Sequence, residues 1–330
     1  MQVSTIGLDQ AKRVFQVHGV DARGEAVVRR RLRRTEVVAF FAARPKCVVG
    51  MEACGAAHYG ARERSELGHE VRLLAPSYVK PYVRRGKKND AADAEAICEA
   101  VERPRRRFVA VKSEEQQGAL MLHRARSLLI RQRTMVVNAL RGHLAELGIV
   151  AAQGIWNVKP PTALVADDGE RRIPEVARPA LRALAEQIAA VQEPLGKIDA
   201  ALLAWHRANA ASRRLATIPG FGPVVAAAVA ATLGDGRQFR SGRHFAAWLG
   251  LVPRQNSSGG KDKLGRLSKM GDRYVRSLLG LGATARLRSA RASGAVDAAW
   301  INRLLERRPA RLVTVALANM PTRWPRRRGH

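Results

Sequence analysis

The first 112 residues alternate short apolar runs with helix-like stretches, and this alternation constrains the fold more strongly than any other feature of the chain. Short β-branched and apolar runs between turn residues are typical of strands, whereas apolar residues spaced three and four apart are typical of helices. Three strands followed by a strand–helix–strand unit predict an α/β layer with mixed strand order. We expect strands at 3–9, 13–20, 26–32, 47–52 and 71–75, and helices near 35–43, 57–67, 77–84 and 90–102.

Four carboxylates occupy special positions in this pattern. Asp9 and Glu52 each end an apolar run, and Asp90 and Asp93 lie three residues apart, which places both on one face of a helix. A carboxylate at the tip of a buried strand is costly unless it is solvated, paired or bound to a metal. The four side chains could therefore converge on two divalent ions, which would activate one oxygen and stabilise another in phosphodiester chemistry.

The charge of the chain points to a polyanionic partner. The 330 residues hold 58 Lys and Arg against 28 Asp and Glu, a formal net charge of +30. Such an imbalance repels itself unless a polyanion neutralises it, and nucleic acid is the usual one. A membrane surface is the alternative, but the sequence has no stretch of 18 or more apolar residues, so we expect no membrane association.

Two further observations predict a cytoplasmic protein. The N-terminus lacks a charged segment followed by a long apolar one, so no signal peptide is expected. Cys47, Cys54 and Cys98 are too few for a disulfide framework and are expected to be small buried residues in a reducing compartment.

The middle of the chain, 113–212, is predicted to form a helical hairpin. Residues 113–148 and 176–210 have helical periodicity, and Pro160, Pro161 and a turn at 167–169 separate them. We interpret this segment as a coiled-coil spacer or oligomerisation arm in preference to a catalytic element.

A third domain, 213–318, begins with a glycine-rich turn. Gly220 and Gly222 lie in Pro-Gly-Phe-Gly-Pro, before an apolar helix that starts at Val224. The arrangement is similar to a helix–hairpin–helix motif, whose backbone N–H groups bind a phosphate. The alternative is an ordinary glycine turn between two core helices.

The same domain contains a Ser-Ser-Gly-Gly loop at 257–260 surrounded by cations. A flexible basic loop is the simpler interpretation. Alternatively, Ser257 or Ser258 is a nucleophile whose phosphoryl ester the cations stabilise, although the sequence indicates no general base nearby. The surrounding cations, which we expect to bind nucleic acid, are Arg254, Lys261, Lys263, Arg266, Lys269, Arg273 and Arg276.

Taken together, these segments resemble the IS110 family of insertion-sequence transposases, in the branch with a Ser-Ser/Thr-Gly-Gly loop. The resemblance extends to about residue 318. Its segments are Gly7-Leu8-Asp9, Gly50 to Gly55, Gly68 to Leu73, Pro76 to Tyr82, Lys88 to Ile97, Arg103-Pro104, Gln132 to Thr134, Ile218 to Pro223 and the serine loop through Arg276. It implies an N-terminal RNase H-like (RuvC-like) domain at 1–112, a coiled-coil arm and a mainly helical C-terminal transposase domain.

The resemblance also implies a mechanism. The family's Asp-Glu-Asp-Asp set, which binds Mg²⁺ (or Mn²⁺), corresponds to Asp9, Glu52, Asp90 and Asp93. A C-terminal serine of the family joins covalently to DNA. A serine next to glycine indicates Ser258, whereas the Ser-Thr-Gly-Gly branch keeps Ser257 open.

Partners follow from the same resemblance. Family members are guided by a noncoding RNA from the element's own flank, which pairs with donor and target DNA, and this division of labour is that of other RNA-guided effectors. Recombination of two DNA segments implies at least a dimer, with a tetramer in the synaptic complex.

The C-terminus departs from the family pattern. A basic tail at 319–330, expected to be disordered, replaces the helix that ends other members. This end could belong to a decayed copy, so a non-catalytic nucleic-acid-binding protein is one alternative function. A separate alternative is a Holliday-junction-type endonuclease, which needs the carboxylates but no serine.

Overall fold

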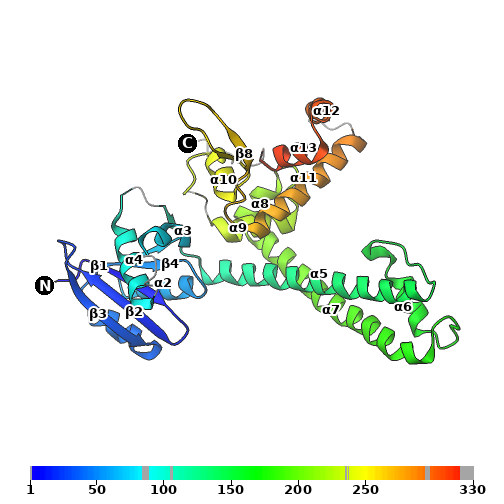
Figure 1. The fold of residues 1–330 in the computed structure, drawn as a ribbon, viewed down its shortest axis with the longest axis horizontal. Coiled ribbons are helices and arrows are strands. Elements are labelled where there is room, and N and C mark those ends of the chain that lie inside the picture. Colours follow the sequence, from blue (N-terminus) through cyan, green and yellow to red (C-terminus); the bar gives the residue numbers. More distant parts are fainter. Residues whose placement is uncertain are drawn as a thin grey trace. The chain divides into compact units, whose positions relative to one another are not determined.

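The computed structural model describes residues 2–83, 89–104, 107–234, 236, 238–293 and 298–319. The chain divides into two compact units, residues 1–114 and 115–330. A mixed sheet dominates the first unit and helices dominate the second (Figure 1). Among the described helices, none combines the length and apolarity needed to span a lipid bilayer.

The first unit is built on a six-stranded sheet of order β3-β2-β1-β4-β5-β6 (Figure 1). Strands β1, β2 and β3 form an antiparallel meander, β4 and β5 continue parallel to β1, and β6 is antiparallel to β5. The predicted α/β layer with mixed strand order is therefore confirmed, and the two-residue β6 is an addition. The strands are β1 (Thr5–Gln10), β2 (Val14–Val20), β3 (Ala26–Arg33), β4 (Val48–Glu52), β5 (Glu70–Leu74) and β6 (Phe108–Val109).

Helices cover both faces of this sheet. Alternation along the strands sends Ile6 and Leu8 into one core with Phe41 and Ala61 of α1 and α2, while helix α4 packs on the opposite face. The helical segments, with short 3₁₀ turns written η, are η1 (Arg34–Glu36), α1 (Val37–Ala42), α2 (Ala57–Glu66), α3 (Pro76–Val79), η2 (Lys80–Tyr82) and α4 (Asp90–Glu102).

Two long helices of the second unit run antiparallel. Helix α5 (Glu114–Glu146) faces α7 (Arg178–Ala208), with Arg126 hydrogen-bonded to Asp199 near one end and Leu144 packed in one core with Leu181 near the other. Pro160 and Pro161 lie between the two long helices along the chain. They lie in the first turn of a short helix, α6 (Lys159–Ala166), where a missing N–H costs no hydrogen bond.

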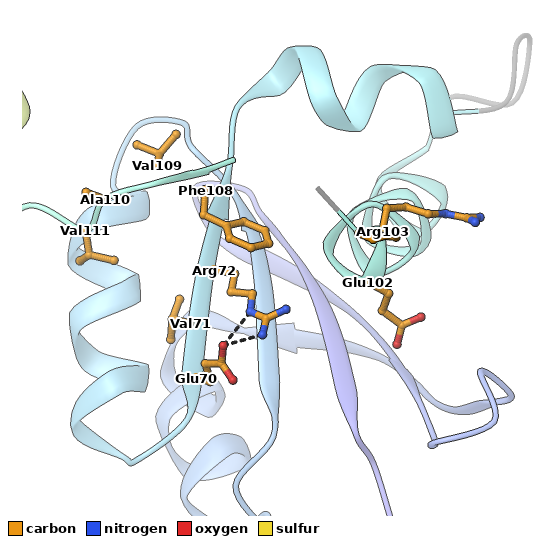
Figure 2. A pocket seen from close by; sticks show the side chains of 10 residues that line it. Glu70, Val71, Arg72, Glu102, Arg103, Phe108, Val109, Ala110 and Val111 are labelled. Carbon is orange, nitrogen blue, oxygen red and sulfur yellow. Dashed lines mark hydrogen bonds and ion pairs between the residues drawn. The ribbon is translucent and has the colours of Figure 1, made fainter. Parts of the chain in front are cut away.

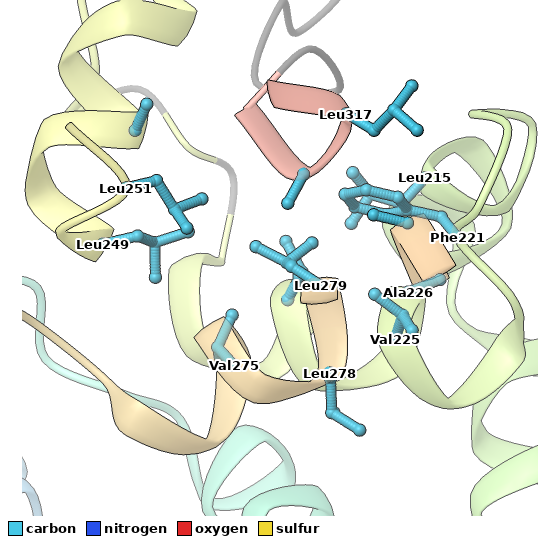
Figure 3. Packing of buried hydrophobic residues seen from close by; sticks show 14 of the residues in the cluster. Leu215, Phe221, Val225, Ala226, Leu249, Leu251, Val275, Leu278, Leu279 and Leu317 are labelled. Carbon is cyan, nitrogen blue, oxygen red and sulfur yellow. The ribbon is translucent and has the colours of Figure 1, made fainter. Parts of the chain in front are cut away.

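The rest of the second unit surrounds a hydrophobic core whose described residues come from six helices and the loops between them (Figure 3). Phe221, Val225, Leu249, Leu279 and Leu317 meet there from segments far apart in the sequence. The elements are α8 (Ala210–Ala216), α9 (Pro223–Leu233), α10 (Gly242–Leu249), β7 (Pro253–Gln255), β8 (Leu264–Leu267), α11 (Arg273–Ser293), α12 (Ala298–Arg307) and α13 (Ala310–Asn319).

The serine loop, the three cysteines and the C-terminal tail can be compared with what the sequence predicts. The serine loop forms the tip of the β7–β8 hairpin. Cys47 and Cys98 are buried as expected, but Cys54 is exposed. Of the predicted tail, Asn319 ends α13 and 320–330 lie outside the described residues.

Candidate active site

Asp9 and Glu52 lie on neighbouring parallel strands at the same edge of the sheet. The β1–β4 register pairs Leu8 with Met51, and each acid follows that pair by one residue. Carboxyl ends of adjacent parallel strands meet at one edge, and acidic side chains there are a recurrent feature of ligand sites. The two strand-end carboxylates are thus side by side.

Two glycines bring helix α4 onto the same face. Gly7 and Gly50 precede the two acids by two residues, so they share their face of the sheet. A Cβ atom on Gly7 would lie 2.1 Å from the Ala94 carbonyl oxygen, and one on Gly50 would lie 2.9 Å from the Val101 Cβ atom. Only glycine permits this close approach between helix and strands.

The first turn of α4 carries the other two carboxylates. The Asn89 side chain caps the helix by accepting the Ala92 N–H at 2.8 Å, which fixes where the helix starts. Asp90 and Asp93 follow in the first turn, where the helix dipole favours negative charge.

The charges of the other three carboxylates act on Asp9. Burial, together with the charges of Asp93, Asp90 and Glu52, raises the pKa of Asp9 from 3.8 to about 6, against the opposing effect of a backbone hydrogen bond at Gln10. Carboxylates that lie close together disfavour one another's ionised form, and a bound cation would relieve this repulsion.

The donor set fits a hard divalent cation, because all four side chains offer carboxylate oxygens, the ligands that Mg²⁺ and Mn²⁺ prefer. Within the described residues, no three His, Cys, Asp or Glu side chains are already close enough to enclose a metal ion. The side chains surround an open edge, so an ion would have to draw them together.

A cavity of about 600 Å³ lies elsewhere in this unit, between β5, β6 and the end of α4 (Figure 2). Arg72 donates from Nε to Glu70 at 2.7 Å there and its guanidinium lies over the Phe108 ring. None of the four carboxylates lines this cavity. We assign it no chemistry, because Glu70 already neutralises Arg72.

In the second unit, the β7–β8 hairpin gives the two serines different surroundings. Its register pairs Gln255 with Leu264 and Ser258 with Lys261, which places Ser257 directly across from Asp262. Gly259 and Gly260 both have positive φ angles, of 56° and 75°, as the two central residues of a type I′ hairpin turn require.

The Ser257 hydroxyl is engaged on both sides. Its Oγ donates to Asp262 Oδ1 at 3.2 Å and accepts the Lys263 N–H at 3.1 Å. Neighbouring residues of a strand point to opposite faces, so Ser258 lies on the other face beside Lys261, and no hydrogen bond engages its hydroxyl within the described part of the chain.

The cations around the hairpin fall into two groups. Arg276 donates to the Leu249 and Met270 carbonyl oxygens at 2.8 and 2.7 Å, and Arg254 donates to the Ser268 carbonyl at 3.4 Å, so both support the local backbone. The remaining predicted cations are exposed, as a nucleic-acid surface requires. Arg266 lies on β8 and Arg273 begins α11. The exposed cations are Lys261, Lys263, Arg266, Lys269 and Arg273.

The glycine turn joins α8 to α9. Gly220 has a φ of 89°, and a Cβ on Gly282 of α11 would lie 2.0 Å from the Gly220 carbonyl oxygen, so the turn rests directly on that helix. Gly222 is exposed and precedes the first turn of α9, whose N–H groups lack a side-chain cap.

Sequence reasoning missed Asp262 as a partner of Ser257, as well as the packing role of Gly7 and Gly50. Both had a signal. Asp262 is five residues from Ser257 across a Gly-Gly turn, a spacing that pairs them in a hairpin. The glycines precede both strand-end acids by the same two residues.

Comparison with known proteins agrees with this architecture. The model of a DEDD transposase family of the IS110 type matches residues 6–149, and that of the transposase IS116/IS110/IS902 family matches 212–296. A Pseudomonas aeruginosa protein named "Probable family 20 transposase" is 49% identical over 98% of this chain and 96% of its own length.

Two further relatives carry names of insertion sequences. The transposase for insertion sequence element IS1328 of Yersinia enterocolitica is 38% identical over 96% of this chain and 94% of its own. That for IS1111A of Coxiella burnetii is 37% identical over 96% and 87%. With identities this high over nearly the whole chain, the protein belongs to the IS110 family of insertion-sequence transposases.

Proposed function

We propose that this transposase cuts and rejoins the DNA of its own mobile element with a divalent-metal centre at Asp9, Glu52, Asp90 and Asp93 and a serine nucleophile on the β7–β8 hairpin. The observation that supports the proposal is geometric: the strand register sets Asp9 beside Glu52, and helix α4, which carries Asp90 and Asp93 in its first turn, packs closely against the same face. DEDD transposases typically use divalent metal ions. The four side chains would hold Mg²⁺ or Mn²⁺, which when bound would polarise the scissile phosphate.

Ser258 is the stronger nucleophile candidate. Its hydroxyl shares a face with Lys261, whose ammonium would stabilise charge on a phosphate. Ser257 faces Asp262, whose carboxylate repels a phosphate, and its hydroxyl is already used in the hairpin. In the proposed step Ser258 Oγ bonds to phosphorus and the bond from phosphorus to a deoxyribose oxygen breaks. The serine proton leaves, and the departing oxygen takes one up.

Binding of nucleic acid would fall to the exposed groups of the second unit. Lys261, Lys263, Arg266, Lys269 and Arg273 would contact phosphates, and the N–H groups after Gly222 would add a backbone contact. An element-encoded noncoding RNA would select donor and target DNA by base pairing. A dimer, and a tetramer in synapsis, would bring the two DNA segments together.

The first experiment compares Ser258→Ala, Ser257→Ala and Asp9→Asn in a cleavage assay with Mg²⁺ that also traps protein joined to DNA. We expect Ser258→Ala to give no covalent adduct and Ser257→Ala to keep one. Asp9→Asn should neither cut nor form the adduct, because the metal centre is incomplete.

Other outcomes support the competing functions. Cleavage that survives the Ser257→Ala/Ser258→Ala double substitution supports a junction-resolving endonuclease. Binding with steep salt dependence but no metal-dependent product supports a non-catalytic protein. Sequencing the RNA that co-purifies with the protein tests the guide separately: one discrete RNA supports it, and heterogeneous nucleic acid does not.

A further inference from the structure

A second site lies beside the carboxylate centre, on the same face of the sheet. A cavity of about 430 Å³ separates strands β2 and β3 from the first turns of α4. Its lining includes Arg29 and Arg31 of β3, His18 of β2 and Glu95 of α4. From sequence alone, the arginine run 29–31 is more simply a solvated surface, but the structure places it at a concave site.

Strand register aligns these arginines with the carboxylate centre. Asp9 pairs with Gln16 of β2, and Gln16 pairs with Arg31 of β3, so one row across three strands runs from carboxylate to guanidinium. Gly7, His18 and Arg29 form the parallel row two residues away. Residues paired directly across strands share a face, so Arg29 and Arg31 lie on the α4 side of the sheet with Asp9.

The charges of this site favour an anion. Both guanidinium groups are exposed, and among the described residues no ion pair joins either one to a carboxylate. Glu95 is the acidic group in the lining. Burial, with Arg29 nearby, lowers the pKa of His18 despite the opposing effect of Glu95, so this histidine is neutral near pH 7.

The ligand should be a phosphodiester chain. Strands are about 4.8 Å apart, so β3 is roughly 10 Å from β1, the axial rise of about three nucleotides of one DNA strand. The start of α4 also borders the cavity and directs the positive end of its dipole there. A DNA strand with one phosphate at the carboxylates would therefore place a phosphate about three nucleotides away near the two arginines.

We propose that Arg29 and Arg31 bind the backbone of the DNA strand that is cut, and so position its scissile phosphate at Asp9. This inference rests on the proposed role of the carboxylates as the cleavage centre. Both arginines contact phosphates and carry no sequence information, because backbone contacts fix register and orientation only.

The test measures binding of a short DNA duplex, and of an RNA duplex of the same length, across a salt series without divalent metal. The full-length Asp9→Asn protein is compared with the same protein carrying Arg29→Ala/Arg31→Ala. The matched control is Arg23→Ala/Lys46→Ala, which removes two exposed cations at the end of the sheet opposite to Asp9 and Glu52.

We expect the arginine variant to bind DNA roughly tenfold more weakly or worse, with a salt slope smaller in magnitude by about 1.8, since each phosphate contact contributes about 0.9. The control should keep its slope. Arg29→Lys/Arg31→Lys, which retains the charges, should recover most of the slope and rules out misfolding as the cause.

An unchanged DNA slope would overturn the proposal, as would a loss confined to the RNA duplex, which would make this an RNA-binding surface. The cleavage assay tests the carboxylate proposal separately. If that proposal is wrong, the Asp9→Asn protein cuts DNA as the unsubstituted protein does. The salt slope does not depend on that result.

Discussion

At the scale of single residues, Asp9 is the most informative group because, in the proposed centre, its proton and a metal ion would compete for the same oxygens. Its pKa in the folded chain is about 6, above its ordinary 3.8, through burial and three neighbouring carboxylates. A carboxyl whose pKa is raised by folding stabilises the fold fully below pH 3.8, and this stabilisation is lost as the pH rises through about 6. Ionised Asp9 therefore lowers the free energy of unfolding of the metal-free protein at neutral pH.

Because ionised Asp9 is destabilising, we expect Asp9→Asn to stabilise the metal-free protein. At about pH 7.5 in EDTA we expect a gain of about 1–2 kcal/mol after allowance for solvent screening, visible as a melting temperature higher by a few degrees. The gain should disappear below pH 3.8, where Asp9 is protonated in both the folded and the unfolded state. Thermal melts of both proteins across pH check this, and a variant that is less stable at every pH would contradict it.

Metal and pH should be linked in the unsubstituted protein. Cleavage and Mn²⁺ affinity should both fall as the pH drops through about 6, because protonated Asp9 is a poor ligand. Calorimetric titration with Mn²⁺ at several pH values measures this directly. An affinity independent of pH between about 5 and 7 would remove Asp9 from the metal site.

At the scale of elements, the position of helix α4 decides whether the four carboxylates meet. Gly7→Ala would put a methyl group against the Ala94 carbonyl oxygen, so the helix would have to move away from the sheet. We expect a loss of stability of about 1–3 kcal/mol and a larger loss of cleavage, since Asp90 and Asp93 move with the helix. Gly24→Ala is a useful comparison for stability alone, because its site is open but its φ is positive. Denaturation and cleavage assays on both variants test this, and a fully active Gly7→Ala protein would show that α4 need not be close.

The elements also show which parts of the fold were predictable. Strands β1 to β5 and helix α4 follow from apolar periodicity, and their ends were placed within about two residues. The β7–β8 hairpin was not predicted, because its strands are short, exposed and basic and so lack the alternation that identifies a half-buried strand. The Ser257–Asp262 pair depends on that hairpin, which is why no partner for the serine was foreseen.

The convergence of the site was predictable only in part. Two strand-end acids and an i,i+3 pair suggested a cluster, but periodicity does not reveal which strands are neighbours. The register that sets Asp9 beside Glu52, and Arg31 two strands away on the same face, is a tertiary property. For the same reason the run 29–31 looked like an ordinary solvated surface.

At the scale of the whole molecule, the two units have separate hydrophobic cores, which predicts at least two unfolding transitions. The sheet core of residues 1–114 and the helical cores of 115–330 share no buried residue. A ligand stabilises only the unit that binds it, by an amount set by its concentration relative to its dissociation constant. Mn²⁺ should therefore raise the melting temperature of one transition and leave the other in place.

Scanning calorimetry of the full chain with and without Mn²⁺ makes this test, and Asp9→Asn identifies the transition. We expect the substitution to abolish most of the metal-induced shift, because it removes a ligand from the carboxylate set, while leaving the second transition unchanged. A DNA duplex should instead raise both transitions, since the arginines of β3 and the cations of the hairpin belong to different units. A single transition that Mn²⁺ raises as a whole would mean that the two units unfold together, and it would contradict this prediction.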